Sequence, residues 1–404
     1  MNILIINCGS SSLKFQLIDS LSEETIAKGL CERIGIPGSQ IVYSAAGREK
    51  SVTVTPMPDH LVAVRLVLDA LTDSVNGVLA DLRLIGAVGH RIVHGGEHFC
   101  GSVLLDDEVI AAVRECNDLA PLHNPANLIG VAACRELMPD VPMVGVFDTA
   151  FHQTMPPKAY LYGIPYQYYE KHKVRRYGFH GTSHAYVSRR AAALYQEKID
   201  PSRSLADLRI IVCHLGNGAS IAAVANGESV DTSMGLTPLE GLIMGTRSGD
   251  IDPAIIEFLA QKEGKSLHEI GEVLNKESGM AGLQGGGSSD FRDITSAYLD
   301  GKRETVRAME TYIYRIAKYV GAYVAAMNGV DVIVFTAGIG ENNGVVRGLV
   351  CDYLGYLGVV LDGAANKVMG EEEVISTAGC PVCVMVVPTD EELMIARETK
   401  ALVG

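Results

Sequence analysis

The chain has 404 residues, of which 48% are hydrophobic and 20% are charged, as in an ordinary globular protein large enough for two domains. Its formal net charge of −14 opposes nonspecific binding to nucleic acid, because phosphate binding depends on clustered Lys and Arg. The N-terminus lacks the basic region of a secretory signal, and no stretch approaches the roughly 18–20 apolar residues that a spanning helix needs. These features predict a cytoplasmic protein with no nucleic-acid or membrane partner.

Short β-branched runs alternate with longer amphipathic stretches, which predicts the α/β class. In chain order, strands are predicted at residues 3–7, 14–19, 41–43, 51–54, 87–92, 143–147, 210–215, 220–225, 332–336 and 382–387. Helices are predicted at residues 61–71, 126–137, 183–195, 253–262, 267–277, 303–327, 344–354 and 391–401. No low-complexity linker divides the chain, and the Gly/Ser-rich run 284–289 is predicted to be a mobile loop at a ligand edge.

The first loop carries the most informative chemistry. A buried strand runs into Asn7, a turn of Gly9 with three serines follows, and Lys14 closes it as a second strand begins. Backbone N–H groups, hydroxyls and one fixed positive charge can hold phosphate oxygens. A similar strand, small-residue turn and strand recur around residues 215–220. This repetition suggests two related halves, each with a phosphate-binding hairpin.

Two more glycine-rich turns, at residues 94–97 and 337–342, follow predicted strands. None of the four turns fits the P-loop, and the turn with Gly338 and Gly340 lacks the spacing of the dinucleotide fingerprint. One such turn alone is weak, because glycine usually serves backbone geometry. Several in one chain favour a nucleotide-binding protein.

Three cations and two carboxylates are candidates for chemistry. Lys14, Arg91 and Arg247 suit phosphoryl or carboxylate oxygens, although any single Arg is more often part of a surface ion pair. Asp148 and Glu391 follow strands and offer the hard oxygens that Mg²⁺ prefers. The alternative for Glu391 is a structural helix start, since the residues at 389 and 392 fit a capping box.

The histidines leave a second chemistry open. His180 lies in a polar, Gly-flanked turn before a helix for which Ser183 is the predicted N-cap. His180 and His184 are spaced i, i+4, as are His90 and His94, which makes a zinc hydrolase a rival hypothesis. A third ligand is not evident, and stoichiometric zinc would be needed to support it. The nine scattered cysteines favour reduced thiols, and the C-x-x-C at 380–383 leads into a strand rather than a redox helix.

Nine sequence blocks distributed over the whole chain resemble the acetate kinase family. They read NxGSSSxK (7–14), GHRxVHGG (89–96), APLHNP (120–125), FDTAFH (147–152), GFHGTSH (178–184), HLGNG (214–218), GTR (245–247), DFR (290–292) and GIGEN (338–342).

This resemblance implies an architecture and a reaction. The fold would be two related α/β domains of the actin-like, ribonuclease H-like ATPase type around a nucleotide cleft. Residues 1–150 plus 388–404 would form the acetate and phosphate lobe, and residues 151–387 the nucleotide-binding and dimerisation lobe of a homodimer. The reaction would be reversible, Mg²⁺-dependent (or Mn²⁺-dependent) transfer of the ATP γ-phosphoryl group to acetate, giving acetyl phosphate and ADP. A propionate kinase of the same family is the alternative.

The resemblance also implies residue roles. Asp148, His180, Arg247 and Arg91 would be catalytic, with Arg91 also binding the acetate carboxylate; Asn7 and Glu391 would hold the metal ion; Val93, Leu122, Phe179 and Pro238 would wall the methyl pocket. The nucleotide would be bound by Ser10, Ser12, Lys14, His214, Leu215, Gly216, Asn217, Gly218, Asp290, Phe291, Arg292, Gly338, Ile339, Gly340, Glu341 and Asn342.

The residues suit such a reaction. A carboxylate substrate is already ionised at neutral pH, so the difficulty lies in bringing one anion to another, which demands positive charge and alignment. We therefore expect direct in-line transfer, with Asp148 positioning Mg²⁺ or a proton-bearing group; a phosphorylated carboxylate is the alternative. A nucleotide-gated chaperone of the same fold is a rival from another class, because fold alone does not fix function.

Overall fold

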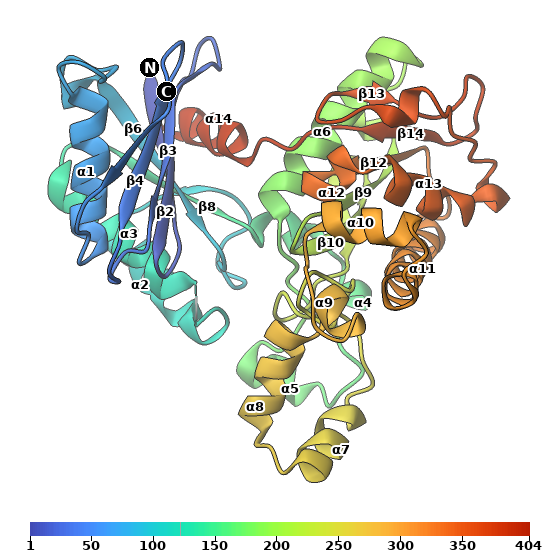
Figure 1. Cartoon of the computed structure of the whole chain (residues 1–404). Helices are drawn as coiled ribbons and strands as arrows, with labels where there is room; N and C mark the ends of the chain where they lie inside the picture. Colours follow the sequence, from blue (N-terminus) through green and yellow to red (C-terminus); the bar gives the residue numbers. More distant parts are fainter. Residues whose placement is uncertain (122) are drawn as a thin grey trace. The chain divides into compact units, whose positions relative to one another are not determined.

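The computed structural model describes residues 1–121 and 123–404. Its internal contacts divide the chain into two compact units (Figure 1). The first unit comprises Met1–Gln153 with Asp390–Gly404, and the second comprises Thr154–Thr389.

The first unit is built on an eight-stranded sheet with the order β5-β4-β3-β2-β1-β6-β8-β7. Strand β1 pairs antiparallel with β2 and parallel with β6, and β6 pairs parallel with β8. The strands are β1 (Asn2–Cys8), β2 (Ser12–Asp19), β3 (Thr25–Glu32), β4 (Gln40–Ala45), β5 (Ser51–Val54), β6 (Ile85–Ile92), β7 (Val103–Leu104) and β8 (Met143–Phe147).

Helices cover both faces of this sheet, which explains why its central strands are apolar on both sides. Leu4 and Ile6 of β1 point into the core shared with α1 and α3, whereas Ile3 and Ile5 point to Ile395 of α14. The red C-terminal helix thus returns to the blue strands of the first unit (Figure 1). The helices are α1 (His60–Thr72), α2 (Asp107–Glu115), α3 (Asn124–Leu137) and α14 (Glu391–Val403), with 3₁₀ turns at Leu82–Leu84, Cys116–Asp118 and Ala150–Thr154.

The second unit contains a six-stranded sheet with the order β11-β10-β9-β12-β14-β13. Its strands are β9 (Arg209–Leu215), β10 (Ala219–Ala225), β11 (Glu228–Thr232), β12 (Val332–Thr336), β13 (Glu373–Val374) and β14 (Cys383–Val386). Its helices are α4 (Pro157–Tyr160), α5 (Gln167–His172), α6 (Gly181–Lys198), α7 (Ala254–Glu263), α8 (Leu267–Glu272), α9 (Gly279–Leu283), α10 (Phe291–Leu299), α11 (Arg303–Ala326), α12 (Ala337–Asn342) and α13 (Gly344–Asp352). A π-helical turn follows α8 at Val273–Glu277, and 3₁₀ turns lie at Leu205–Asp207, Gly355–Leu357 and Ala365–Lys367.

The two sheets share one five-stranded plan. In the first unit it runs β3-β2-β1-β6-β8, and in the second β11-β10-β9-β12-β14. Each begins with three antiparallel strands and continues with two parallel ones. The predicted α/β class and the relation between the two halves are therefore confirmed.

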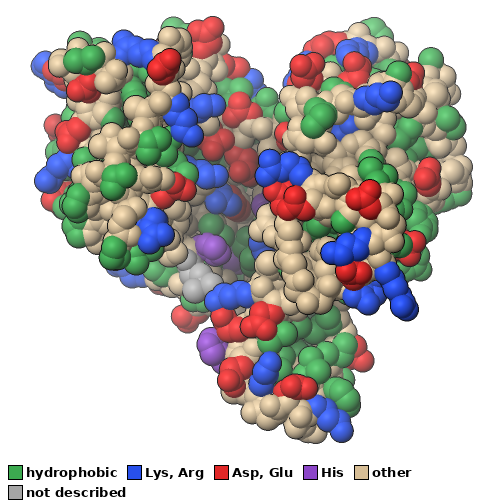
Figure 2. Space-filling model, viewed as in Figure 1, with side chains coloured by type: hydrophobic (Ala, Val, Ile, Leu, Met, Phe, Trp, Pro, Cys, Tyr) green, Lys and Arg blue, Asp and Glu red, His purple; other side chains and the backbone are tan. Residues whose placement is uncertain are grey.

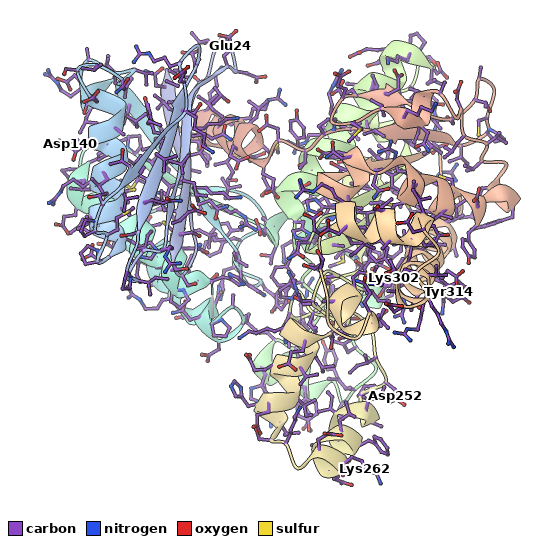
Figure 3. All side chains as sticks on the ribbon, viewed as in Figure 1. Glu24, Asp140, Asp252, Lys262, Lys302 and Tyr314 are labelled. Carbon is purple, nitrogen blue, oxygen red and sulfur yellow. The ribbon has the colours of Figure 1, made fainter. Side chains whose placement is uncertain are left out.

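Charges on the surface of both units are mixed. Figure 2 shows acidic and basic side chains interspersed over the visible face rather than gathered in one basic patch. At the two ends of α7, the Asp252 carboxylate accepts from the backbone N–H of Ala254, and Lys262 lies in the last turn (Figure 3). This order of charge matches the helix dipole.

Among the described residues, no helix combines the length and apolar character needed to span a bilayer.

Two hydroxyls considered as helix N-caps do not cap their helices. Helix α6 begins at Gly181 with His180 as its N-cap, and Ser183 lies inside the first turn. Helix α14 is capped by Asp390, whose carboxylate accepts from the backbone N–H of Leu393, so the capping box expected from residue 389 does not form. In both cases the hydroxyl expected to cap the helix is hydrogen-bonded to another side chain, because Ser183 and Thr389 bond each other at 2.7 Å.

Two buried histidines in the first unit predict an acid-sensitive fold. Burial lowers the pKa of His90 to about 3 and that of His94 to about 4, from 6.5. Below pH 6.5 the unfolded chain binds protons that the folded chain excludes, so the free energy of unfolding is expected to fall as pH decreases from 6.5 towards 4. Each ring contributes a slope of up to about 1.4 kcal/mol per pH unit.

Urea unfolding from pH 7 to pH 4.5 measures this slope. The His90→Met variant is expected to flatten the slope, and the exposed His98, replaced by Gln, controls for loss of an imidazole outside the core. Equal flattening in both variants would contradict the assignment.

Candidate active site

In the first unit, three predicted site residues meet at the carboxyl ends of parallel strands. Arg91 of β6 donates to Asp148, which directly follows β8, through Nε at 3.0 Å and Nη2 at 2.5 Å. Its Nη1 lies 3.4 Å from Oδ1 of Asn7 in β1. The ion pair therefore uses two of the three guanidinium nitrogens of Arg91 and leaves Nη1 with donor capacity.

Carboxylates crowd this end of the sheet. Burial raises the pKa of Asp148, and the Arg91 guanidinium opposes that rise while the charge of Glu391 adds to it. Burial also raises the pKa of Glu392, reinforced by Glu391 and Asp390 and opposed by Lys14. Oxygen Oε1 of Glu391 is buried and has no hydrogen-bond partner among the described residues. An orphaned carboxylate oxygen beside other acidic groups fits a hard divalent cation, with Asn7 and Glu391 as the residues that would hold it.

The first loop is a tight hairpin between β1 and β2. The N–H of Gly9 donates to the Ser12 carbonyl at 2.8 Å, and the Gly9 carbonyl lies 2.8 Å from Nε2 of His60. Ser10 is exposed in the turn, and exposed Lys14 on β2 is opposite Asn7 in the register. The hydroxyls and the ammonium group expected to face phosphate are thus accessible next to Asn7.

Helix α3 fixes the backbone beyond β6. Its Asn127 accepts from the Val93 N–H at 3.1 Å and donates to the Cys8 carbonyl at 2.7 Å, while Asn124 exchanges two hydrogen bonds with the His94 backbone. Val93 is buried, with 7% of its surface exposed. Leu122, predicted to wall the same pocket, lies outside the described residues.

In the second unit, the start of α6 docks onto a cross-strand pair. His214 of β9 and Ser220 of β10 are direct partners in the sheet. Oγ of Ser220 lies 2.9 Å from Nδ1 of His180 and 2.8 Å from Nε2 of His184, and Ser183 bonds Nδ1 of His214 at 2.8 Å. The rings of His180 and His214 stack with centroids 4.2 Å apart.

His180 owes its position to an uncommon backbone. It adopts φ 56° and ψ 24°, a left-handed conformation that costs about 1–3 kcal/mol for a residue with a side chain and is often found at functional sites. The next helical turn carries His184, whose N–H donates to the His180 carbonyl at 2.9 Å. Both imidazoles therefore reach the same hydroxyl.

Arg247 and His180 converge on the second glycine-rich turn. A Cβ placed on Gly218 would lie 3.0 Å from Nη2 of Arg247 and 3.5 Å from Nε2 of His180. Nη1 of Arg247 donates to the Pro238 carbonyl at 2.6 Å, and burial lowers the pKa of Arg247. Arg247 forms no ion pair within the described part of the chain. A half-buried guanidinium without a counter-ion, beside an imidazole and a glycine turn, is suited to binding an anion.

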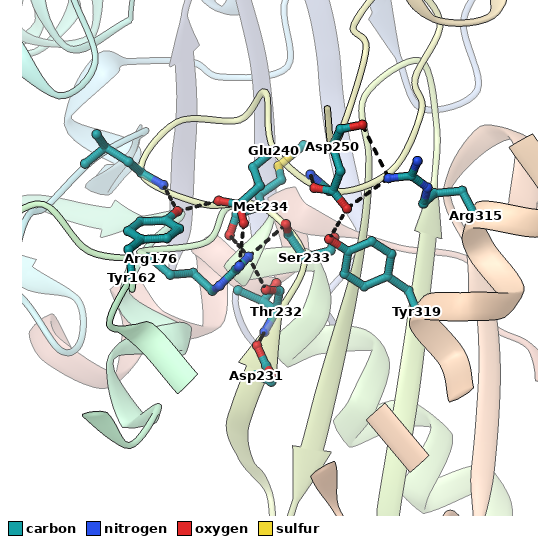
Figure 4. Close-up of polar contacts among 12 residues, drawn as sticks. Tyr162, Arg176, Asp231, Thr232, Ser233, Met234, Glu240, Asp250, Arg315 and Tyr319 are labelled. Atoms are coloured by element: carbon teal, nitrogen blue, oxygen red, sulfur yellow. Dashed lines mark hydrogen bonds and ion pairs between the residues drawn. The ribbon is translucent and has the colours of Figure 1, made fainter. Parts of the chain in front are cut away.

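Two polar clusters anchor the segment that carries Arg247 (Figure 4). At one end, Arg176 pairs with Glu240 at 2.5 Å and donates to the carbonyls of residues 232–234, and Tyr162 donates to the same Glu240. At the other end, Asp250 accepts from Arg315 at 3.0 Å and from Tyr319 at 2.8 Å. These contacts fix both ends of residues 233–250.

The comparisons with known proteins match this chain over its full length. The model of the acetokinase family matches residues 2–397. The chain belongs to the acetokinase family. It is 62% identical to the acetate kinase of Agathobacter rectalis, over 100% of both chains. Among solved structures, the acetate kinase of Porphyromonas gingivalis matches with a TM-score of 0.95 and 49% identity over 100% of both chains, and a propionate kinase from Francisella tularensis with 0.90 and 41% over 99% of both. The predicted family and its actin-like ATPase fold are confirmed.

The segments expected to receive adenosine in this acetokinase lie on neighbouring helices of the second unit. Asp290 caps α10 and pairs with exposed Arg292 at 2.5 Å. Residues 337–342, which the sequence predicts to be a turn, form the short helix α12 instead. Asn343, after α12, donates to Thr295 of α10 at 2.7 Å, which joins the two helices.

Two predicted nucleotide residues are engaged elsewhere. The ring of Phe291 is 7% exposed and packs 5.0 Å from that of Tyr312. Glu341 accepts from the Thr389 N–H at 3.0 Å and from Thr336 at 3.4 Å.

The methyl-pocket residues are divided between the units, because Val93 belongs to the first and Phe179 and Pro238 to the second.

Sequence reasoning missed the contacts that support this acetokinase site. Ser183, Ser220, Asn127 and Glu240 contact predicted site residues or their loops. A signal existed for Ser220, since it faces His214 across the predicted hairpin. The others depend on contacts between elements far apart in the chain.

Proposed function

We propose that this protein is an acetate kinase, which transfers the γ-phosphoryl group of ATP reversibly to acetate and yields acetyl phosphate and ADP. The observation that carries the proposal is the convergence of Arg247 and His180 on Gly218 at the end of a nucleotide-type hairpin. The guanidinium and the imidazole would face the phosphoryl group as its charge develops. The names of the relatives support the assignment of acetate as acceptor.

The Arg91 pair supplies the acceptor side of the proposed reaction. Nη1 of Arg91 retains donor capacity and would bind the acetate carboxylate, while Asp148 holds the guanidinium in orientation. Asp148 thereby acts through Arg91 rather than as a base, since the acceptor needs no deprotonation. Ser10, Ser12 and Lys14 would contact the phosphates from the same unit.

Mg²⁺ is the proposed cofactor, with Mn²⁺ as a substitute. It would be held by Asn7 and Glu391, where the unpartnered Oε1 of Glu391 favours it. When bound, the ion would neutralise phosphate charge.

We also propose a cytoplasmic homodimer, in which a first lobe (1–150 with 388–404) serves acetate and phosphate and a second lobe (151–387) serves the nucleotide and dimerisation.

A hydroxamate assay tests the proposed activity. Purified protein with ATP, Mg²⁺ and hydroxylamine is incubated with acetate, propionate, butyrate or formate. Formation of acyl hydroxamate that is highest with acetate supports the proposal. No product with any acid would overturn it, and a higher kcat/KM with propionate would favour the propionate kinase alternative, which the Francisella relative keeps in view.

We further propose direct in-line transfer. ATP that is chiral at the γ-phosphorus is expected to give acetyl phosphate with inverted configuration, because a single displacement inverts the centre. Net retention would indicate two displacements and a phosphorylated protein group instead.

Val93 is expected to tune the acid that is accepted. Its buried side chain would crowd the extra methylene of propionate, and one methylene in an apolar pocket is worth about 1–3 kcal/mol. The Val93→Ala variant should therefore raise kcat/KM for propionate relative to acetate, up to about tenfold, measured with both acids. Val103→Ala, at a half-buried valine of the same unit, is the control, and an unchanged ratio in Val93→Ala contradicts the prediction.

A further inference from the structure

Ser220 stands out among residues that the proposed reaction leaves unassigned. It is fully buried, lies on β10 and touches two imidazoles, Nδ1 of His180 at 2.9 Å and Nε2 of His184 at 2.8 Å. A serine hydroxyl carries one hydrogen and accepts through its lone pairs. Donating to one ring, it must accept from the other, so the protonation of these two nitrogens is coupled.

Only one of the two arrangements suits an anion. If Nδ1 of His180 carried the hydrogen, the neutral ring would present the lone pair of Nε2, which repels a phosphoryl oxygen. If Nε2 of His184 donates to Ser220, and Ser220 donates to Nδ1 of His180, then His180 carries its hydrogen on Nε2. That nitrogen lies beside Gly218 and Arg247, because a Cβ on Gly218 would be 3.5 Å from it and 3.0 Å from Nη2 of Arg247.

We propose that Ser220 is a positioning residue that fixes the tautomer of His180, so that the neutral ring presents Nε2–H to the transferred phosphoryl group. This inference rests on the proposed phosphoryl transfer. It assigns a role to Ser220, a residue to which the family motifs give none. His180 remains the residue that touches the substrate, and Ser220 acts through it. The left-handed backbone of His180 and the stacking of its ring on His214 hold the ring in the orientation in which Nδ1 meets Ser220.

Histidine ¹⁵N NMR tests the tautomer without reference to catalysis. In ¹⁵N-histidine-labelled full-length protein at pH 7.5, the His180 signals, assigned by their loss in His180→Gln, should show a protonated Nε2 and an unprotonated Nδ1. In Ser220→Ala and in Ser220→Cys, whose thiol is a weak donor of similar shape, the His180 signals should shift towards a mixture of tautomers. Ser188→Ala is the matched control, because Ser188 is similarly buried on α6 but its hydroxyl bonds, among the described residues, the Ala185 carbonyl alone.

Kinetics give the second readout. Loss of one hydrogen bond predicts a kcat about 3- to 10-fold lower in both Ser220 variants, with KM for ATP within about twofold of the wild-type value. A wild-type His180 that is protonated on Nδ1, or on both nitrogens, would overturn the proposal. So would Ser220 variants whose tautomer matches that of Ser188→Ala. Absence of kinase activity in the wild type would overturn the proposed function and leave the NMR result standing.

Discussion

Replacing Arg247 with alanine is expected to lower kcat for acetyl phosphate formation by about 10³-fold or more, the scale of a positioned arginine in phosphoryl transfer. Arg247 is half-buried, its Nη1 is held by the Pro238 carbonyl, and Nη2 points to the space above Gly218. Since it has no carboxylate partner among the described residues, the guanidinium is available to an incoming anion. Arg247→Lys keeps the positive charge but loses the planar set of guanidinium donors. Its kcat should therefore lie between those of the wild-type protein and Arg247→Ala.

Steady-state kinetics with acetate and ATP measure the Arg247 effect. Arg203→Ala is a suitable control, because Arg203 pairs with Asp331 next to the opposite end of β9. We expect its kcat to stay within about twofold of the wild-type value. A loss of less than tenfold in Arg247→Ala, with the variant folded, would contradict the role given to this residue.

The sequence predicted the buried strands well because their signal is local. All ten predicted strands and all eight predicted helices overlap observed elements. Four of the described strands were not predicted. Strands β7 and β13 have two residues each, and β3 and β11 are half-exposed or polar, so neither of the latter offers an apolar run or clear alternation. The sequence predicts a turn where helix α12 lies, because two of its six residues are glycine and glycine has a low helix propensity.

Side-chain partnerships were harder to predict than elements. The residue at 389 fits an N-cap as well as Asp390 does, and only the bond between Thr389 and Ser183 decides which one caps α14. Phe291 belongs to a motif that implies adenosine contact, yet its ring packs on Tyr312. The contact between Thr389 and Ser183 joins residues 206 positions apart, and no local pattern encodes it.

The motif residues show the same difference between identifying a residue and predicting its contacts. The resemblance identified Arg91 and Asp148 separately, Arg91 as a catalytic residue that also binds the acetate carboxylate and Asp148 as a catalytic residue. Their bidentate pairing follows from the parallel register of β6 and β8, in which Arg91 is opposite Val146 and the chain reaches Asp148 two residues later. The register therefore adds what the motifs lack, namely that the two residues act as one unit.

Removing one member of this buried pair is expected to affect both stability and activity. The side chains of Arg91 and Asp148 are 22% and 2% exposed, so solvent screens their interaction little. In Asp148→Ala, the cation is left half-buried with its carboxylate partner gone, and a broken buried pair typically costs about 3–5 kcal/mol. Urea unfolding should report a loss of that size in the unit that contains β6, and kcat should fall by about 10²-fold or more because Arg91 loses its orientation.

The double variant Arg91→Met with Asp148→Leu separates the two effects. Apolar replacement of both partners removes the unpaired charge, so most of the lost free energy of unfolding should return while the activity stays absent. If the double variant retained activity, neither residue would contact the acetate carboxylate or orient the group that does. If Asp148→Ala were as stable as the wild-type protein, the pair would be a solvated contact, and the orientation of Arg91 would have to come from Asn7 and the substrate.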